Sequence, residues 1–165
     1  MPRPTTTYDI LLSCPGDVQE ELRILKEVVD DFNRTSGARM GINLSIRHWS
    51  TDSFAQTGGE PQKLLNEQFI QNTDAVIGII WTKLGTPTEE YDSGTVQEIL
   101  EAYAAGKQVF IYFSDIPVSM SKIDSEQKKK VDDFRKKIEV EKIGMYKSYG
   151  SIEEFSKLVT QDLLL

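Results

Sequence analysis

The sequence predicts an α/β fold: a flavodoxin-like, doubly wound sheet of five parallel strands in the order 2-1-3-4-5, with helices on both faces. Three observations support this fold class. Strand-like and helix-like segments alternate from Tyr8 to Leu165. Segment 74–81 is a continuous apolar run, as expected for a central parallel strand that is covered on both faces. A chain of 165 residues also suffices for a single domain with a substantial core.

The first strand is expected at residues 8–13, which form a short apolar run. The helix after it is expected to open at Gly16 or Asp17 and to end at Gly37, because glycine commonly terminates helices. The apolar residues between these limits keep the spacing of one helix face. They are Val18, Leu22, Leu25, Val29 and Phe32.

Residues 42–49 alternate between apolar and polar side chains, which predicts a half-buried edge strand. A loop containing Gly58 and Gly59 follows. A helix is expected from about Pro61, because proline is favoured in the first turn of a helix. The buried strand at 74–81 comes next.

The second half of the chain continues the alternation. A helix carrying Glu98 is expected to run to Ala105 and to be terminated by Gly106. Segment 108–113 predicts the fourth strand, and segment 114–124 a loop.

The last two helices are separated by a short strand. The first of them carries Val131, Phe134 and Ile138 on one face, and segment 145–149 predicts a weak final strand. Ser151 and Glu154 have the spacing of a capping box, which opens the final helix.

Composition excludes several classes of function. A net charge of −7 and a pI of about 4.8 disfavour a nucleic-acid interface, which depends on Lys and Arg neutralising phosphates. The lysine run 128–130 is followed by acidic residues and is interpreted as a solvated helix face. The single cysteine, Cys14, excludes an internal disulfide and a cysteine-cluster metal site. We find no signal-peptide pattern and no membrane-length apolar run, and we therefore expect a cytoplasmic domain without a membrane contact or a metal.

The expected strand order places a crevice between the first and third strands at their carboxyl ends. Residues 13–17 form one lip and residues 81–86 the other, while the second strand contributes Trp49. The helix with Glu98 begins just behind the third strand. We therefore expect Ser13, Trp81 and Glu98 to line one cleft.

Several residues at this edge have two interpretations. Gly16 can let a phosphate approach a helix N-terminus, or simply form a turn. No dinucleotide-binding or P-loop motif is present. Trp49 and Trp81 can stack on a base or a nicotinamide ring, or close the ends of core strands. A thiolate of Cys14 could be stabilised at a helix start, but no base supports a nucleophilic role.

Glu98 also has two interpretations. The run Thr95-Val96-Gln97-Glu98 has the pattern of a capping box, in which Thr95 caps the helix and Glu98 reaches back to a backbone N–H. A lone carboxylate near two tryptophans also suggests cleavage of a glycosidic bond in a nucleotide. A cap and a catalytic role do not exclude each other.

Taken together, these residues resemble bacterial TIR-like (Toll/interleukin-1 receptor-like) domains. The resemblance covers nearly the whole chain. It runs through segments 10–18, 32–33, 78–87, 93–95 and 102–103, together with Glu20, Glu21, Trp49, Asp52 and Glu98. The start of the helix at residues 94–98 also looks like that of the related nucleoside 2-deoxyribosyltransferases. In both groups the glutamate that matches Glu98 is the carboxylate at the scissile ribose.

For catalytic TIR domains the resemblance implies hydrolysis of NAD+ at the nicotinamide–ribose bond, with NAD+ as substrate and no cofactor. We expect Glu98 to be catalytic, and the residues that bind substrate to lie along the crevice. These are Ser13, Cys14, Gly16, Trp49, Trp81, Gly85, Thr86, Asp92, Ser93 and Thr95.

The resemblance leaves two alternatives open. One is a non-catalytic module that self-associates and signals. The other is a deoxyribosyltransferase-like enzyme, for which Asp92 would be the second acid. The resemblance further implies antiviral defence, activation by oligomerisation, and a single domain at the N-terminus of a longer protein with a C-terminal sensor or ATPase domain.

Overall fold

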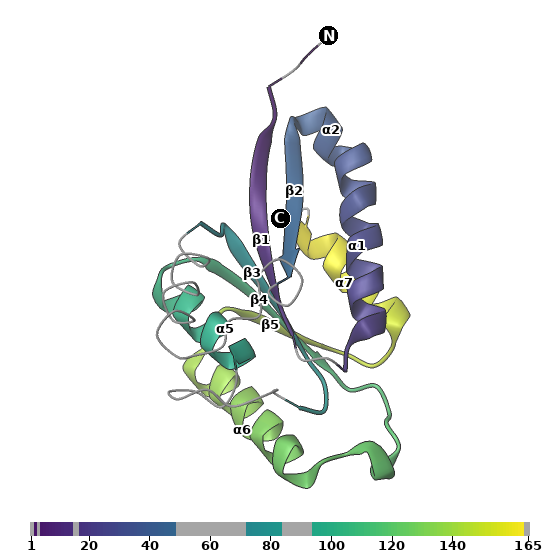
Figure 1. Ribbon diagram of the computed structural model, residues 1–165, viewed down its shortest axis with the longest axis vertical. Helices are drawn as coiled ribbons and strands as arrows, with labels where there is room; N and C mark the ends of the chain where they lie inside the picture. Colours follow the sequence, from purple (N-terminus) through teal and green to yellow (C-terminus); the bar gives the residue numbers. More distant parts are fainter. Residues whose placement is uncertain (1, 3, 15–16, 49–71, 84–93, 164–165) are drawn as a thin grey trace, which may run out of the picture.

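The computed structural model describes residues 2, 4–14, 17–48, 72–83 and 94–163. It confirms the predicted flavodoxin-like fold: five strands form one sheet in the order β2-β1-β3-β4-β5, and every neighbouring pair is parallel (Figure 1). The ends of the strands coincide with the predicted ends or differ from them by at most two residues. The strands are β1 Thr6–Ser13, β2 Ile42–His48, β3 Ala75–Ile80, β4 Gln108–Ser114 and β5 Met145–Tyr149.

Helices cover both faces of this sheet. Helices α1 and α7 pack against one face, and α5 and α6 against the other (Figure 1). Their bounds are α1 Gln19–Arg34, α2 Ser36–Met40, α5 Gly94–Ala104, α6 Ser125–Glu141 and α7 Ile152–Leu163, with a short 3₁₀ helix at Met120–Lys122. The helix expected from Pro61, and the loop with Gly58 and Gly59, lie outside the described residues. None of the helices in the described ranges is long and apolar enough to cross a membrane.

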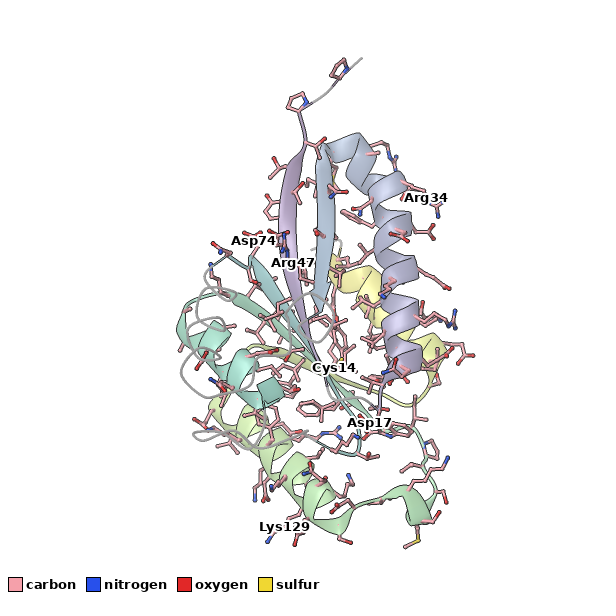
Figure 2. All side chains as sticks on the ribbon, in the orientation of Figure 1. Cys14, Asp17, Arg34, Arg47, Asp74 and Lys129 are labelled. Carbon is pink, nitrogen blue, oxygen red and sulfur yellow. The ribbon has the colours of Figure 1, made fainter. Side chains whose placement is uncertain are left out.

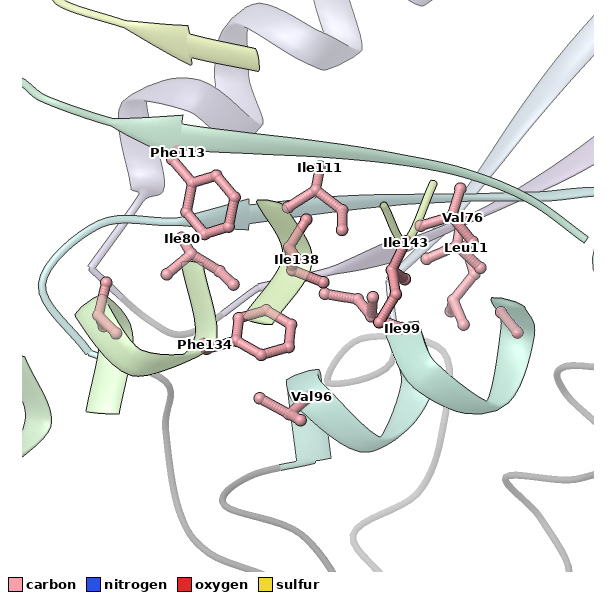
Figure 3. Close-up of a cluster of buried hydrophobic side chains, with 13 residues drawn as sticks. Leu11, Val76, Ile80, Val96, Ile99, Ile111, Phe113, Phe134, Ile138 and Ile143 are labelled. Carbon is pink, nitrogen blue, oxygen red and sulfur yellow. The ribbon is translucent and has the colours of Figure 1, made fainter. Parts of the chain in front are cut away.

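Two apolar clusters, one on each face, hold the layers together. Alternate residues of each strand enter opposite clusters: Leu11 of β1 belongs to the α5–α6 cluster, whereas Leu12 belongs to the α1–α7 cluster. Figure 3 shows the first of these clusters, in which Ile99 of α5 and Ile138 of α6 meet the sheet. The alternation determines which polar side chains at the ends of the strands face which helices.

The prediction that Gly37 ends the first helix is wrong. Helix α1 ends at Arg34, and Gly37 lies inside the short helix α2. The chain leaves α2 through Gly41, which has a left-handed backbone with φ 71°. Gly37 is needed for packing, because a Cβ there would lie 2.5 Å from the carbonyl oxygen of Ile42. The amino end also differs, since α1 begins at Gln19 and not at Gly16 or Asp17.

The predicted capping box of the last helix is confirmed, with one difference. The backbone N–H of Glu154 donates to Ser151 Oγ at 3.1 Å. The Glu154 carboxylate accepts in turn from the N–H of Gly150 at 3.0 Å, one residue before the cap. Helix α7 is thus fixed directly after β5.

Replacing Ser151 with Ala should lower the free energy of unfolding by about 1 kcal/mol, because the N–H of Glu154 loses its acceptor. Urea denaturation followed by circular dichroism measures this difference. Ser156→Ala, inside the same helix, is the matched control and should cost less, because alanine is the best helix former. Equal losses in the two variants would contradict the capping role.

Candidate functional site

Glu98 lies in the first turns of α5, at the edge of the sheet where the strands end. Its side chain is 5% exposed, which is rare for a carboxyl group. Val96 and Ile99, on the same helix, belong to the α5–α6 cluster and fix α5 against the sheet (Figure 3). Gly78 of β3 permits this close packing, because a Cβ there would lie 2.7 Å from Ile99 Cδ1. The position of Glu98 is therefore set by the core.

Ser13 is the described partner of Glu98 across the crevice. It is the last residue of β1, it is 2% exposed, and it lies two residues after Leu11, so its side chain leaves the sheet on the α5 face. Its hydroxyl donates a hydrogen bond to the carbonyl oxygen of Thr95 at 3.4 Å, and hydrogen bonding by the same hydroxyl lowers the pKa of the Glu98 carboxyl. The structure thus brings together three of the predicted site residues.

The environment of Glu98 raises its pKa to about 7, from an ordinary value of 4.5. Burial is the largest cause, because a charged carboxylate is poorly solvated there. The hydrogen bond from Ser13 lowers the pKa, and the negative charge of Glu101 raises it. Glu101 itself accepts a hydrogen bond from the Gln97 amide at 3.1 Å. A carboxyl that titrates near neutral pH in such a place is a candidate for chemistry.

The structure does not support Thr95 as the helix cap. Helix α5 spans Gly94–Ala104, so Thr95 lies inside the helix. The contact of Glu98 that the structure describes runs to Ser13 on β1. The capping-box interpretation of this segment is therefore wrong at Thr95.

Cys14, labelled in Figure 2, directly follows Ser13, the last residue of β1, and its side chain is half-buried. Burial raises the pKa of its thiol to about 12, and the negative charges of Glu98, Asp17 and Glu21 contribute to this rise. The thiol is thus protonated at neutral pH, and the environment does not stabilise a thiolate. These couplings also show that three carboxyl groups gather around the end of β1.

Asp17 joins the two lips of the crevice. One carboxylate oxygen, Oδ2, accepts hydrogen bonds from the backbone N–H of Thr82 at 3.1 Å and from its hydroxyl at 2.7 Å. The other oxygen, Oδ1, is buried and has no hydrogen-bond partner among the residues that the structure describes. The connection after β1 is therefore tied directly to the connection after β3.

Trp81 lies on the other face of the sheet. Its indole N–H donates to the carbonyl oxygen of Ile116 at 2.9 Å, and its ring packs against the α1–α7 cluster. Of the three residues expected to line one cleft, the structure brings Ser13 and Glu98 together and packs Trp81 on the opposite face. Six further predicted site residues lie outside the described residues: Gly16, Trp49, Gly85, Thr86, Asp92 and Ser93.

Sequence reasoning missed a buried pair at the same edge. Glu21 is 4% exposed, and Tyr149, at the end of β5, is 1% exposed and donates its hydroxyl to Glu21 at 2.5 Å. Burial, followed by the hydrogen bond to Glu21, raises the pKa of Tyr149. The available signal was the position of Glu21 one turn before Leu25, on the apolar face of α1.

The arrangement suits electrostatic chemistry by carboxyl groups. In the described part of the chain, no group of three or more His, Cys, Asp and Glu side chains is placed to hold a metal ion. A buried carboxyl beside a hydroxyl can stabilise a developing positive charge or transfer a proton.

Comparison with known proteins identifies one family. The family model described as a domain of unknown function, DUF4062, matches residues 13–164. A search of curated proteins found no match.

Solved structures show a distant likeness. The chain is similar to Staphylococcus aureus homoserine dehydrogenase (10% identity, 87% of this chain and 33% of that chain, TM-score 0.45). It is also similar to a Streptococcus pneumoniae flavodoxin (16% identity, 96% and 97% covered, TM-score 0.42). A third neighbour is Clostridium botulinum CMP N-glycosidase (15% identity, 94% and 98% covered, TM-score 0.43). The chain spans about a third of the dehydrogenase. The fold assignment itself rests on the strand order.

Proposed function

The chain belongs to the DUF4062 family, a domain of unknown function, and we propose that it is a TIR-like domain that hydrolyses NAD+ at the nicotinamide–ribose bond. The observation that carries the proposal is the buried carboxyl of Glu98, hydrogen-bonded by Ser13 at the carboxyl edge of the sheet. Ligands of doubly wound sheets bind at this edge.

One carboxylate suffices for this reaction. Most glycosidases need a second carboxyl group, which protonates the leaving oxygen. Nicotinamide carries a positive charge in NAD+ and leaves as a neutral molecule, so no general acid is required. The transition state resembles an oxocarbenium ion, and the carboxylate of Glu98 would stabilise the charge that develops on the ribose.

The charges around the site support a cationic substrate. Glu98, Asp17 and Glu21 all raise the pKa of Cys14, so their negative charges act on a common region at the end of β1. A cationic ring bound beside Glu98 would favour its ionised form, because an opposite charge lowers the pKa of a carboxyl group. Binding of NAD+ would thereby produce the form of Glu98 that the reaction requires.

The proposal extends to assembly and context. TIR-like domains typically complete their site with a neighbouring copy, and we propose that this domain self-associates in the same way. The proposed setting is cytoplasmic antiviral defence, with a C-terminal sensor or ATPase domain that controls the assembly.

The direct test incubates the purified, concentrated protein with NAD+ and measures free nicotinamide by chromatography. Release of nicotinamide is the expected result. Transfer of deoxyribose between bases, with no nicotinamide release, would favour the deoxyribosyltransferase-like alternative. Neither reaction in a protein that self-associates would favour the non-catalytic signalling module.

Activity should depend on protein concentration. If a second copy completes the site, the rate of nicotinamide release per molecule should rise with concentration and with fusion to an oligomerising partner. A dilution series at saturating NAD+, with the oligomeric state measured in parallel, checks this. A rate per molecule that stays constant across the series would contradict assembly-dependent activation.

A further inference from the structure

We infer that Ser13 is a positioning residue for Glu98. The Ser13 hydroxyl pairs with the Glu98 carboxyl group in both of its protonation states and holds this group in place beside the first turn of α5. The importance of Ser13 for catalysis rests on the proposed function, but its hydrogen bonding to Glu98 in the two protonation states does not.

The geometry limits what the hydroxyl can do. A serine hydroxyl has one hydrogen to donate and two lone pairs to accept with. Ser13 Oγ donates to the carbonyl oxygen of Thr95 at 3.4 Å, and the Glu98 carboxyl, one turn further along the same helix, is the second acceptor within its reach. Because Ser13 is 2% exposed and Glu98 is 5% exposed, water has little access to either group. The one hydrogen must therefore be shared according to the charge of Glu98.

The two states differ in the direction of the hydrogen bonds. When Glu98 is ionised, the Ser13 hydrogen points to its carboxylate. When Glu98 takes up a proton, its own O–H donates to Ser13 Oγ, and the Ser13 hydrogen turns to the carbonyl oxygen of Thr95. The Ser13 and Glu98 oxygens stay paired in both states, as buried polar groups require.

The negative groups around Ser13 and Glu98 oppose ionisation of Glu98, and the Ser13 hydroxyl counteracts them. Glu101, on the same helix, raises the pKa of Glu98, and burial raises it more. Asp17 and Glu21, from the connection after β1 and from α1, are further negative groups that act with Glu98 on Cys14. Of the influences on Glu98 that the structure describes, the hydrogen bond from Ser13 is the one that favours the carboxylate. Ser13 therefore sets how much carboxylate is present near neutral pH.

The experiment titrates Glu98 by carbon-13 NMR of its side-chain carboxyl, with Glu98→Gln used to assign the signal. In Ser13→Ala the midpoint should move upward by roughly 1 pH unit, because a hydrogen bond to the charged form is lost. Ser13→Thr keeps the hydroxyl and should restore the original midpoint. Ser114→Ala is the matched control: it removes a buried hydroxyl from the end of β4 that bonds to Ile116 N and not to Glu98.

The rate of nicotinamide release gives a second measurement. The rate should rise with pH as Glu98 ionises. In Ser13→Ala the pH at the midpoint of this rise should move upward by the same amount as the NMR midpoint. Should Ser13→Ala fail to fold, Ser13→Cys, with a weaker S–H donor, should move the midpoint in the same direction by less. An unchanged midpoint in a folded Ser13 variant without the hydroxyl would overturn the inference. Absence of nicotinamide release in the wild-type protein would contradict only the proposed function, because the titration does not require activity.

Discussion

Replacing Glu98 with Gln should leave a folded protein whose release of nicotinamide from NAD+ is lower by on the order of a hundredfold. Gln keeps the size of the side chain and can still pair with the Ser13 hydroxyl, but it carries no negative charge. The loss should therefore appear in kcat, because the charge acts on the transition state. Steady-state kinetics at pH 8, at a protein concentration that supports assembly, measures the effect.

Glu101→Gln is the matched control for this experiment. It removes the same charge from the same helix, three residues further on, where Glu101 bonds to Gln97. This variant should keep most of the activity, and it should lower the pKa of Glu98 because a like charge is removed. A fully active Glu98→Gln protein would end the catalytic interpretation and favour the interaction module.

The same Glu98→Gln substitution should stabilise the protein at pH 8 by roughly 3 kcal/mol, the free energy that corresponds to a pKa raised from 4.5 to about 7. At pH 4 the substitution should change stability little, because Glu98 is then protonated in both the folded and the unfolded chain. The gain is expected to develop between these two pH values.

The direction of this pH dependence follows from the number of protons that the folded and the unfolded chain bind. Between pH 4.5 and about 7, the folded chain retains the Glu98 proton while the unfolded chain releases it. The wild-type protein therefore loses stability as pH rises through this window, and the loss is constant above about pH 7. A glutamine side chain does not titrate, so the substituted protein avoids this loss.

Urea denaturation of the wild-type and Glu98→Gln proteins at several pH values measures the difference between their free energies of unfolding. The titration of all other groups is common to both proteins and cancels in this difference. A difference that is the same at pH 4 and pH 8 would show that burial does not raise the pKa of Glu98. This measurement needs no activity, so it tests the electrostatics of the site independently of the proposed reaction.

Local sequence determined the fold. A period of two residues marks strands, and helical spacing marks faces such as that of Val131, Phe134 and Ile138, which are buried as expected. These signals depend on neighbours a few residues apart, so they placed the five strands within one or two residues. They also predicted the capping box at Ser151, whose partners lie within four residues of each other.

Local signals were misleading where packing decided the outcome. Gly37 looked like a helix terminator, but it is buried inside α2 because its missing Cβ lets the chain approach Ile42. Thr95 looked like a cap, but it lies inside α5. In each case the residue type was compatible with two structures, and the residue type alone could not select between them.

The candidate site shows the same division. The sequence identified Glu98 and the edge of the sheet and expected Ser13 and Glu98 in one cleft, but it predicted neither the hydrogen bonding between them nor the pairs Asp17–Thr82 and Glu21–Tyr149. The last two pairs are separated by 65 and 128 residues. Only the tertiary structure decided them, because a side chain's partner depends on the face from which it leaves its strand and on how closely the next connection approaches. The burial that raises the pKa of Glu98 likewise exists only in the packed fold.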